Sequence, residues 1–227
     1  LLVDGFLIDF PEPKIPELSQ FVESLQTPVI WLNTRREKDC VYPDEEHGLD
    51  AVTSALIEAG HRHILYLGNE FSNHTHYSNR DREKGYRQAM KRAGLGAQSM
   101  LYNPETMKCH DSIWQQLVGL MHSADRPTAM VAYGPDHAGM AVGMALELGL
   151  RIPEDLNVVV CHDAEVRSLR PYRIALARIP IREAAEKGME MLHAKIETQR
   201  KHVPPVKIPY TLDEALFSHI TPPETRD

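Results

Sequence analysis

The chain has 227 residues, of which 42% are hydrophobic and 25% charged, and this suits one large or two small soluble globular domains with a sizeable core. Its 25 Lys and Arg residues are outnumbered by 32 Asp and Glu residues, and the net charge of -7 disfavours contact between this segment and nucleic acid. No apolar run reaches membrane-spanning length, and the first ten residues show neither a basic leader nor a cleavage pattern. We therefore expect no anchor and no export signal in the numbered chain.

Short apolar blocks alternate with amphipathic stretches along the chain. Blocks of this length favour strands that are covered on both faces, and apolar stripes at three- and four-residue spacing favour helices. Gly60 and Gly149 are placed to end two of these helices. In chain order we expect a strand at 3–8, a helix at 18–25, a strand at 28–32, a helix at 49–59, a strand at 64–68, helices at 86–93 and 113–121, a strand at 128–133, a helix at 141–148, a strand at 157–161 and a helix at 181–197.

Strands that are separated by single helices cannot pair as hairpins. They must run parallel and be joined by right-handed crossovers. The sequence therefore predicts an α/β fold built from doubly wound parallel sheets.

Neither the histidines nor the cysteines have the spacing of a metal site. His61 and His63 flank one arginine in EAGHRHILYLG, without the i, i+4 helical spacing that places two imidazoles on one metal, and we interpret them as the turn between a helix and a strand. His74 and His76 lie in the polar stretch SNHTHYSNR and are expected to be loop residues. The three cysteines are odd in number and far apart, which argues against disulfides and zinc and fits a reducing cytoplasm; they are Cys40, Cys109 and Cys161.

Five segments, in order and at matching spacing, resemble the effector-binding domain of LacI/GalR-family transcriptional repressors. They are EAGHRHILYLG, RDREKGYRQAMKRAG, RPTAMVAYGPDHAGMAVGMALELGLRIPEDLNVVVCHD, IPIREAAEKGMEMLHAKI and LFSHITPP. The resemblance implies two α/β lobes of the periplasmic-binding-protein type, joined by three crossover segments, with a small-molecule cleft between them.

Carried onto this chain, the resemblance places 1–41 and 181–205 in the N-terminal lobe, 42–180 and 206–220 in the C-terminal lobe, and 221–227 in a tail. The family's domains begin with two further strands and helices before the segment matching 3–8, and a helix-turn-helix head precedes those. We therefore expect the first lobe to be truncated at its N-terminus.

The resemblance also implies ligand-binding residues. Arg82 begins REKGY, where the family's arginine is similar to a clamp on hydroxyl or carboxyl oxygens, for which a guanidinium offers a planar fork of donors. Asp163 follows NVVVCH and matches an aspartate that accepts hydrogen bonds from sugar hydroxyls, and Asn33 ends VIWLN, where either a donor or an acceptor is useful. Each has an alternative: an exposed arginine at a helix start, an aspartate that caps the following turn, and a turn-forming asparagine.

The loop YGPDH departs from the family pattern. Gly-Pro stands where relatives carry Asn-Asp, which removes a ligand side chain, and Tyr133 or Asp136 could compensate. Asp136 is equally placed as a helix N-cap. Where relatives present an aromatic ring to the ligand, this chain has MKC at 107–109, and we expect the nearby Trp114 to belong to the core.

These observations favour a binding module over an enzyme. No Gly-x-Ser-x-Gly elbow, His-Glu-x-x-His pair, phosphate loop or dinucleotide fingerprint occurs, so we expect no catalytic site, cofactor or metal. The resemblance predicts the sensing domain of a LacI-type repressor that binds a sugar-like effector between its lobes, forms a homodimer, and contacts operator DNA through a head absent from the numbered chain. The alternative is a solute-binding protein of a sugar transporter, which shares the fold.

Overall fold

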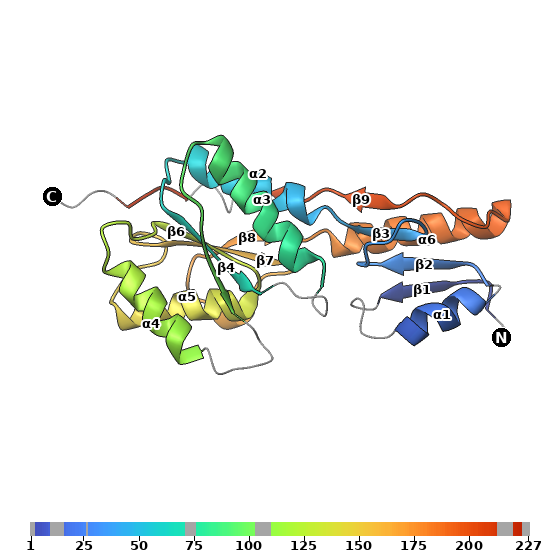
Figure 1. Cartoon of the computed structure of the whole chain (residues 1–227), viewed down its shortest axis with the longest axis horizontal. Helices are drawn as coiled ribbons and strands as arrows, with labels where there is room; N and C mark the ends of the chain where they lie inside the picture. The colour runs from blue at the N-terminus through green and yellow to red at the C-terminus, as the bar shows by residue number, and fades with distance from the viewer. Residues whose placement is uncertain are drawn as a thin grey trace. The chain divides into compact units, whose positions relative to one another are not determined.

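The computed structural model describes residues 3–9, 16–25, 27–70, 76–102, 110–212 and 220–223, and the chain divides into two compact units (Figure 1). The first unit comprises Leu1–Asp44, Phe71–Ser78 and Pro180–Tyr210. The second comprises Glu45–Glu70, Asn79–Ile179 and Thr211–Asp227. Each unit contains one sheet, and within the described ranges no helix is both long and apolar enough to cross a bilayer.

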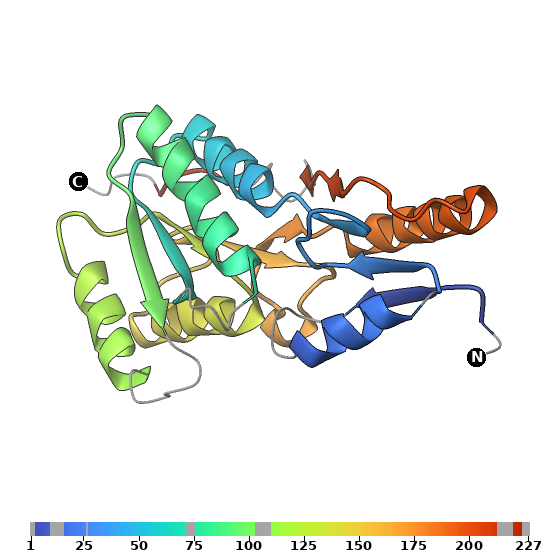
Figure 2. The same cartoon turned by 45° about the vertical axis from the view of Figure 1, so that its right-hand side comes forward.

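The first unit is a parallel sheet between two helices (Figure 2). The described strands follow the order β1 (Phe6–Asp9), β2 (Val29–Leu32), β3 (Cys40–Pro43) and β9 (Val206–Ile208). Because successive residues of a strand point to opposite faces, Val29 and Trp31 pack with Val22 of α1 (Pro16–Ser24), while Ile30 packs with Leu192 of α6 (Ile181–Thr198).

A buried carboxylate holds three segments of the first unit together. The Asp39 carboxylate accepts hydrogen bonds from Lys195 Nζ at 2.8 Å, His202 Nδ1 at 2.8 Å and the Val203 amide at 2.9 Å. Burial opposes ionisation, but these bonds together hold the pKa of Asp39 below its ordinary value. Lys195 is itself 6% exposed, so this ion pair belongs to the interior of the unit.

The second unit is a larger sheet with helices on both faces (Figure 1). The described strands follow the order β10-β8-β7-β6-β4-β5, all parallel except the edge strand β10. Helices α2 and α3 cover one face, where Tyr66 stacks on Tyr86 of α3, and α4 and α5 cover the other, where Leu65 joins the core with Met144 of α5. The bounds are α2 (Glu45–Glu58), β4 (Ile64–Asn69), α3 (Ser78–Arg92), β5 (Gln98–Tyr102), α4 (His110–Met121), β6 (Ala129–Ala132), α5 (Pro135–Glu147), β7 (Asn157–His162), β8 (Ala175–Arg178) and β10 (Thr211–Leu212).

The doubly wound α/β class is confirmed, and the junction at Gly60 is as predicted. α2 ends at Glu58, Gly60 adopts a left-handed φ of 107°, and β4 begins at Ile64. His61 lies inside this junction with its Nδ1 2.8 Å from Thr128 Oγ1, and burial lowers its pKa to about 4. It is therefore a neutral structural side chain.

The observed division of the chain differs from the predicted lobe boundaries. β3 extends to Pro43, so the first unit continues to Asp44 and does not stop at residue 41. Residues 206–220 were expected in the second lobe, but β9 pairs with β3 through Val41↔Val206 and belongs to the first sheet. Among the described residues of this region, β10 alone pairs in the second sheet, where it runs antiparallel to β8.

Candidate functional site

Polar residues stand at the carboxyl ends of four parallel strands of the second unit. Along this edge the order is Tyr102 at the end of β5, Asn69 at the end of β4, Tyr133 directly after β6, and Asp163 directly after β7. Neighbouring strands lie about 4.8 Å apart, so these residues form a row, which we call the carboxyl edge. Ligands of parallel α/β sheets bind beyond such an edge.

Gly85 allows α3 to pack closely against α2, and this places Arg82 near the carboxyl edge. A Cβ atom at residue 85 would stand 2.0 Å from the carbonyl oxygen of Glu46, so α3 and α2 approach at backbone contact. Arg82 lies one helical turn before Gly85 on the same buried face and is only 5% exposed. Its guanidinium thereby reaches Glu45 in the first turn of α2.

The guanidinium of Arg82 makes a bidentate ion pair inside the unit. Nε donates to Glu45 Oε2 at 2.6 Å and one terminal nitrogen donates to Oε1 at 3.0 Å, with both side chains buried. The other terminal nitrogen donates to the Tyr133 carbonyl at 2.6 Å, and the guanidinium lies 4.5 Å from the centre of the Tyr133 ring. The alternative of an exposed helix-start arginine is wrong, because Arg82 is buried and its fork is engaged by a carboxylate of the chain itself.

The rings of Tyr102, Tyr133 and His137 form an aromatic cluster at the carboxyl edge. The ring of His137, in the first turn of α5, lies 4.8 Å from that of Tyr102 and 5.6 Å from that of Tyr133. His137 is 3% exposed, and burial lowers its pKa to about 4, so the imidazole is neutral. The Gly68 carbonyl is near enough to act on that pKa, but neither ring nitrogen meets hydrogen-bond geometry.

Asp136 does not cap α5. Gly134 occupies the N-cap position without a side-chain hydrogen bond, and Asp136 is exposed in the first turn, where its charge meets the positive end of the helix. The N-cap alternative for Asp136 is therefore wrong.

Asp163 is an exposed carboxylate on the same edge. Its Oδ1 lies 2.9 Å from His162 Nδ1, and its backbone carbonyl accepts a hydrogen bond from Arg178 at 3.0 Å. The structure thus brings Arg82, Tyr133, Asp136 and Asp163 to the ends of adjacent strands of one sheet.

Asn33 lies in the first unit, directly after β2. Its φ of 52° is left-handed, a conformation that asparagine tolerates in turns, so the turn-forming role is present. Its carbonyl accepts a hydrogen bond from His76 Nε2 at 2.7 Å, and this fixes His76 as a loop residue of that unit.

Two other predictions concern the neighbourhood of the edge. Trp114 packs against the core of the second unit and its Nε1 donates to Glu147 at 2.8 Å, which agrees with a core role. The segment 107–109, including Cys109, and His74 lie outside the described residues. Within the described ranges, no group of three His, Cys, Asp or Glu side chains could hold a metal ion.

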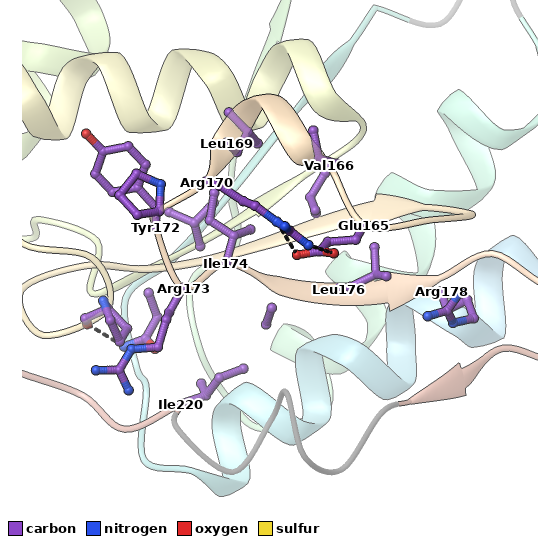
Figure 3. Close-up of a pocket in the computed structure, with 16 residues that line it drawn as sticks. Glu165, Val166, Leu169, Arg170, Tyr172, Arg173, Ile174, Leu176, Arg178 and Ile220 are labelled. Carbon is purple, nitrogen blue, oxygen red and sulfur yellow. Dashed lines mark hydrogen bonds and ion pairs between the residues drawn. The ribbon is translucent and has the colours of Figure 1, made fainter.

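A separate hollow of about 590 Å³ lies along β7 and β8 (Figure 3). Its lining is mainly apolar and comes from the loop around the short 3-10 helix Arg167–Leu169, with Val166, Leu169, Ile174 and Ile220 among the residues shown. The ion pair of Arg170 with Glu165 lies at its margin. No predicted site residue is among the residues that line this hollow, and its surface is mainly apolar, so the carboxyl edge fits a polar ligand better.

Sequence reasoning missed Glu45 and His137. Glu45 lies in the acidic stretch PDEEHG, which is typical of a helix N-terminus and gives no indication of a buried ion pair. His137 could have been found, because it lies four residues before Ala141 on the apolar stripe of α5 and so falls on the buried face.

Comparison with known proteins agrees with the fold. Residues 53–214 match the model of the periplasmic binding protein-like domain. The chain is 28% identical over 201 residues to the HTH-type transcriptional regulator GntR of Escherichia coli K12, covering 86% of this chain and 57% of that protein. It is 24% identical over 198 residues to the HTH-type transcriptional repressor PurR of Vibrio vulnificus, covering 86% and 58%. The chain thus spans little more than half the length of these curated relatives.

Solved structures give the same fold. A regulatory protein of the LacI family from Chloroflexus aggregans superposes with a TM-score of 0.73 at 26% identity, covering 92% of this chain and 75% of that one. A LacI family transcriptional regulator from Enterococcus faecium, with bound ribose, has a TM-score of 0.72 at 19% identity, covering 93% and 78%. At that identity the second comparison concerns the fold alone.

Proposed function

Because the chain belongs to the periplasmic binding protein-like domain family, in the form found in LacI-family regulators, we propose that it is the effector-sensing part of a transcriptional regulator. The observation that carries the proposal is the convergence of Arg82, Tyr133 and Asp163 at the carboxyl edge of a parallel sheet. Ligands of such sheets bind beyond this edge.

The proposed effector is a small polar molecule such as a sugar. Asp163 offers an exposed carboxylate that can accept hydrogen bonds from hydroxyl groups, and the Tyr133 ring offers an apolar face. The Enterococcus faecium regulator, which shares the fold, binds ribose, which is a ligand of this class.

The proposed output is a change in operator binding. A helix-turn-helix segment outside the numbered residues would contact DNA, as the names of the relatives indicate, and two copies of the chain would form the regulator. An effector needs only to bind one of two states more tightly, and a difference of a few kcal/mol suffices to switch the population. The similarity to regulators favours this function over that of a transporter's binding protein.

Calorimetric titration and thermal-shift measurements with sugars and nucleosides test the proposal, because specific binding raises the apparent stability by mass action. In the Asp163→Asn variant we expect at least a tenfold loss of affinity for whichever compound binds, since a charged acceptor contributes about 1.5–3 kcal/mol. Asp125→Asn is the matched control, because Asp125 lies in the loop before β6, at the opposite end of that strand, and should leave affinity unchanged. Equal affinity of the Asp163 variant and the wild type would refute the assignment of this edge.

A further inference from the structure

We infer that the effector carries no negative charge, because the arginine at the carboxyl edge is already neutralised by Glu45 and the rest of the edge is more acidic than basic. This inference rests on the proposed function and names the chemical class of its ligand. Three observations carry it: the buried ion pair, the charges along the edge, and the neutral polar groups beside them.

The buried ion pair leaves Arg82 unsuited to hold an anion. Both oxygens of Glu45 are within 3.0 Å of the guanidinium, and the side chains are 6% and 1% exposed for Arg82 and Glu45. A ligand carboxylate or phosphate could take the fork only by displacing Glu45, and an unpaired buried carboxylate costs several kcal/mol. If the pair stays intact, Arg82 presents no net positive charge to the ligand.

The exposed charges of the edge also disfavour an anion. Among the described residues, the acidic side chains at or just after the strand ends outnumber the basic ones. The acidic residues are Glu70, Asp136, Asp163 and Glu165, and the basic ones are Arg167, Arg170 and Arg178. Arg170 is itself paired with Glu165. At physiological ionic strength charges act over about 8 Å, so an anion bound in the row would be repelled by the nearest carboxylates.

The edge does offer neutral hydrogen-bonding groups. The two ring nitrogens of His137 and Oδ1 of Asn69 are buried and have no hydrogen-bond partner. Asn69 pairs in register with Tyr102, whose ring lies against His137, so these groups are neighbours. Because buried polar atoms nearly always have a partner, this spot suits a hydroxyl group, an amide or an ordered water molecule. Neutral donors and acceptors of this kind recognise an uncharged polar ligand.

Matched pairs of compounds that differ by one acidic group test the inference. The pairs are ribose and ribose 5-phosphate, glucose and gluconate, and inosine and inosine monophosphate, each titrated calorimetrically into the wild-type chain. We expect a neutral member to bind and its acidic counterpart to bind at least tenfold more weakly. An acidic member that binds as tightly as its neutral counterpart overturns the inference and leaves the sensor function standing. Binding of no compound counts against the sensor function and the inference with it.

A variant then tests whether Glu45 is the cause. Glu45→Gln removes the charge that neutralises Arg82, and we expect this variant to bind inorganic phosphate, seen as a rise in melting temperature that the wild type does not show. Glu45→Asp keeps the charge and is the matched control, without phosphate binding. The claim that Glu45 keeps Arg82 from binding an anion is overturned if a folded Glu45→Gln chain does not bind phosphate, or if the wild-type chain binds it. If Glu45→Gln fails to fold, the matched pairs still decide the charge of the ligand.

Discussion

Replacing Arg82 by alanine should destabilise the second unit strongly, even without any ligand. The substitution leaves the Glu45 carboxylate, which is 1% exposed, buried without its bidentate partner. Breaking a buried pair in this way costs about 3–5 kcal/mol. That is a large share of the roughly 5–15 kcal/mol that stabilises an ordinary protein, so Arg82→Ala is not a clean test of ligand binding.

Urea unfolding of a double-mutant cycle measures this energy. We expect Arg82→Ala and Glu45→Ala each to lower the free energy of unfolding by about 3–5 kcal/mol, and the double variant to lose much less than the sum, because neither charge is then left alone. Tryptophan fluorescence of Trp114, which packs in the same unit, follows the transition. Losses below about 1 kcal/mol in both single variants, adding up in the double variant, would refute the claim that the pair is structurally required.

Four further substitutions test other parts of the structure. Gly85→Ala should destabilise by about 3 kcal/mol or more, because the new methyl group meets backbone at 2.0 Å, whereas Gly119→Ala in α4 has open space and should stabilise by about 0.5–1 kcal/mol; chemical denaturation compares them. Burial lowers the pKa of both His137 and His61 to about 4 in the folded chain, against about 6.5 when unfolded, so each contributes on the order of 3 kcal/mol of stability that is present above pH 6.5 and lost as the pH falls through 4; His137→Leu should remove about half of this loss from the pH profile of the unfolding free energy. The lowered pKa of Asp39 gives stability that is present above about pH 3.8 and lost as the pH falls through the folded value, so in Asp39→Asn this acid-dependent loss should vanish from thermal melts recorded between pH 5 and 2.

Much of the second sheet could be predicted because its central strands are uninterrupted apolar runs. β4, β6 and β7 fall where those runs lie, since a parallel strand covered on both faces has few polar positions. β5 and β8 were missed because QSMLY and ALAR are short and include polar residues at the margins of the sheet. The pairing of β9 with β3 joins residues 165 positions apart in Val41↔Val206, a separation that local patterns do not report.

The position of the candidate site in the fold could be predicted from the sequence, but the contacts between its residues could not. Residues that follow strands must lie at the carboxyl edge, so Tyr133 and Asp163 could be assigned to it from the sequence. The partner of Arg82 could not be assigned, because it depends on how closely α3 approaches α2 at Gly85. An acidic residue at a helix start is usually solvated, and nothing near Glu45 in the sequence shows that it is buried.

The buried Asp39 network has a consequence for synthesis on the ribosome. Asp39 emerges first, and its partners Lys195, His202 and Val203 emerge more than 150 residues later. At about 5–20 residues per second this delay lasts roughly 8–30 seconds, and the long middle segment of the second unit, up to Ile179, is translated within it. The first unit is therefore completed only after most of the second unit has been translated, and until then its β-strands lack the packing of α6.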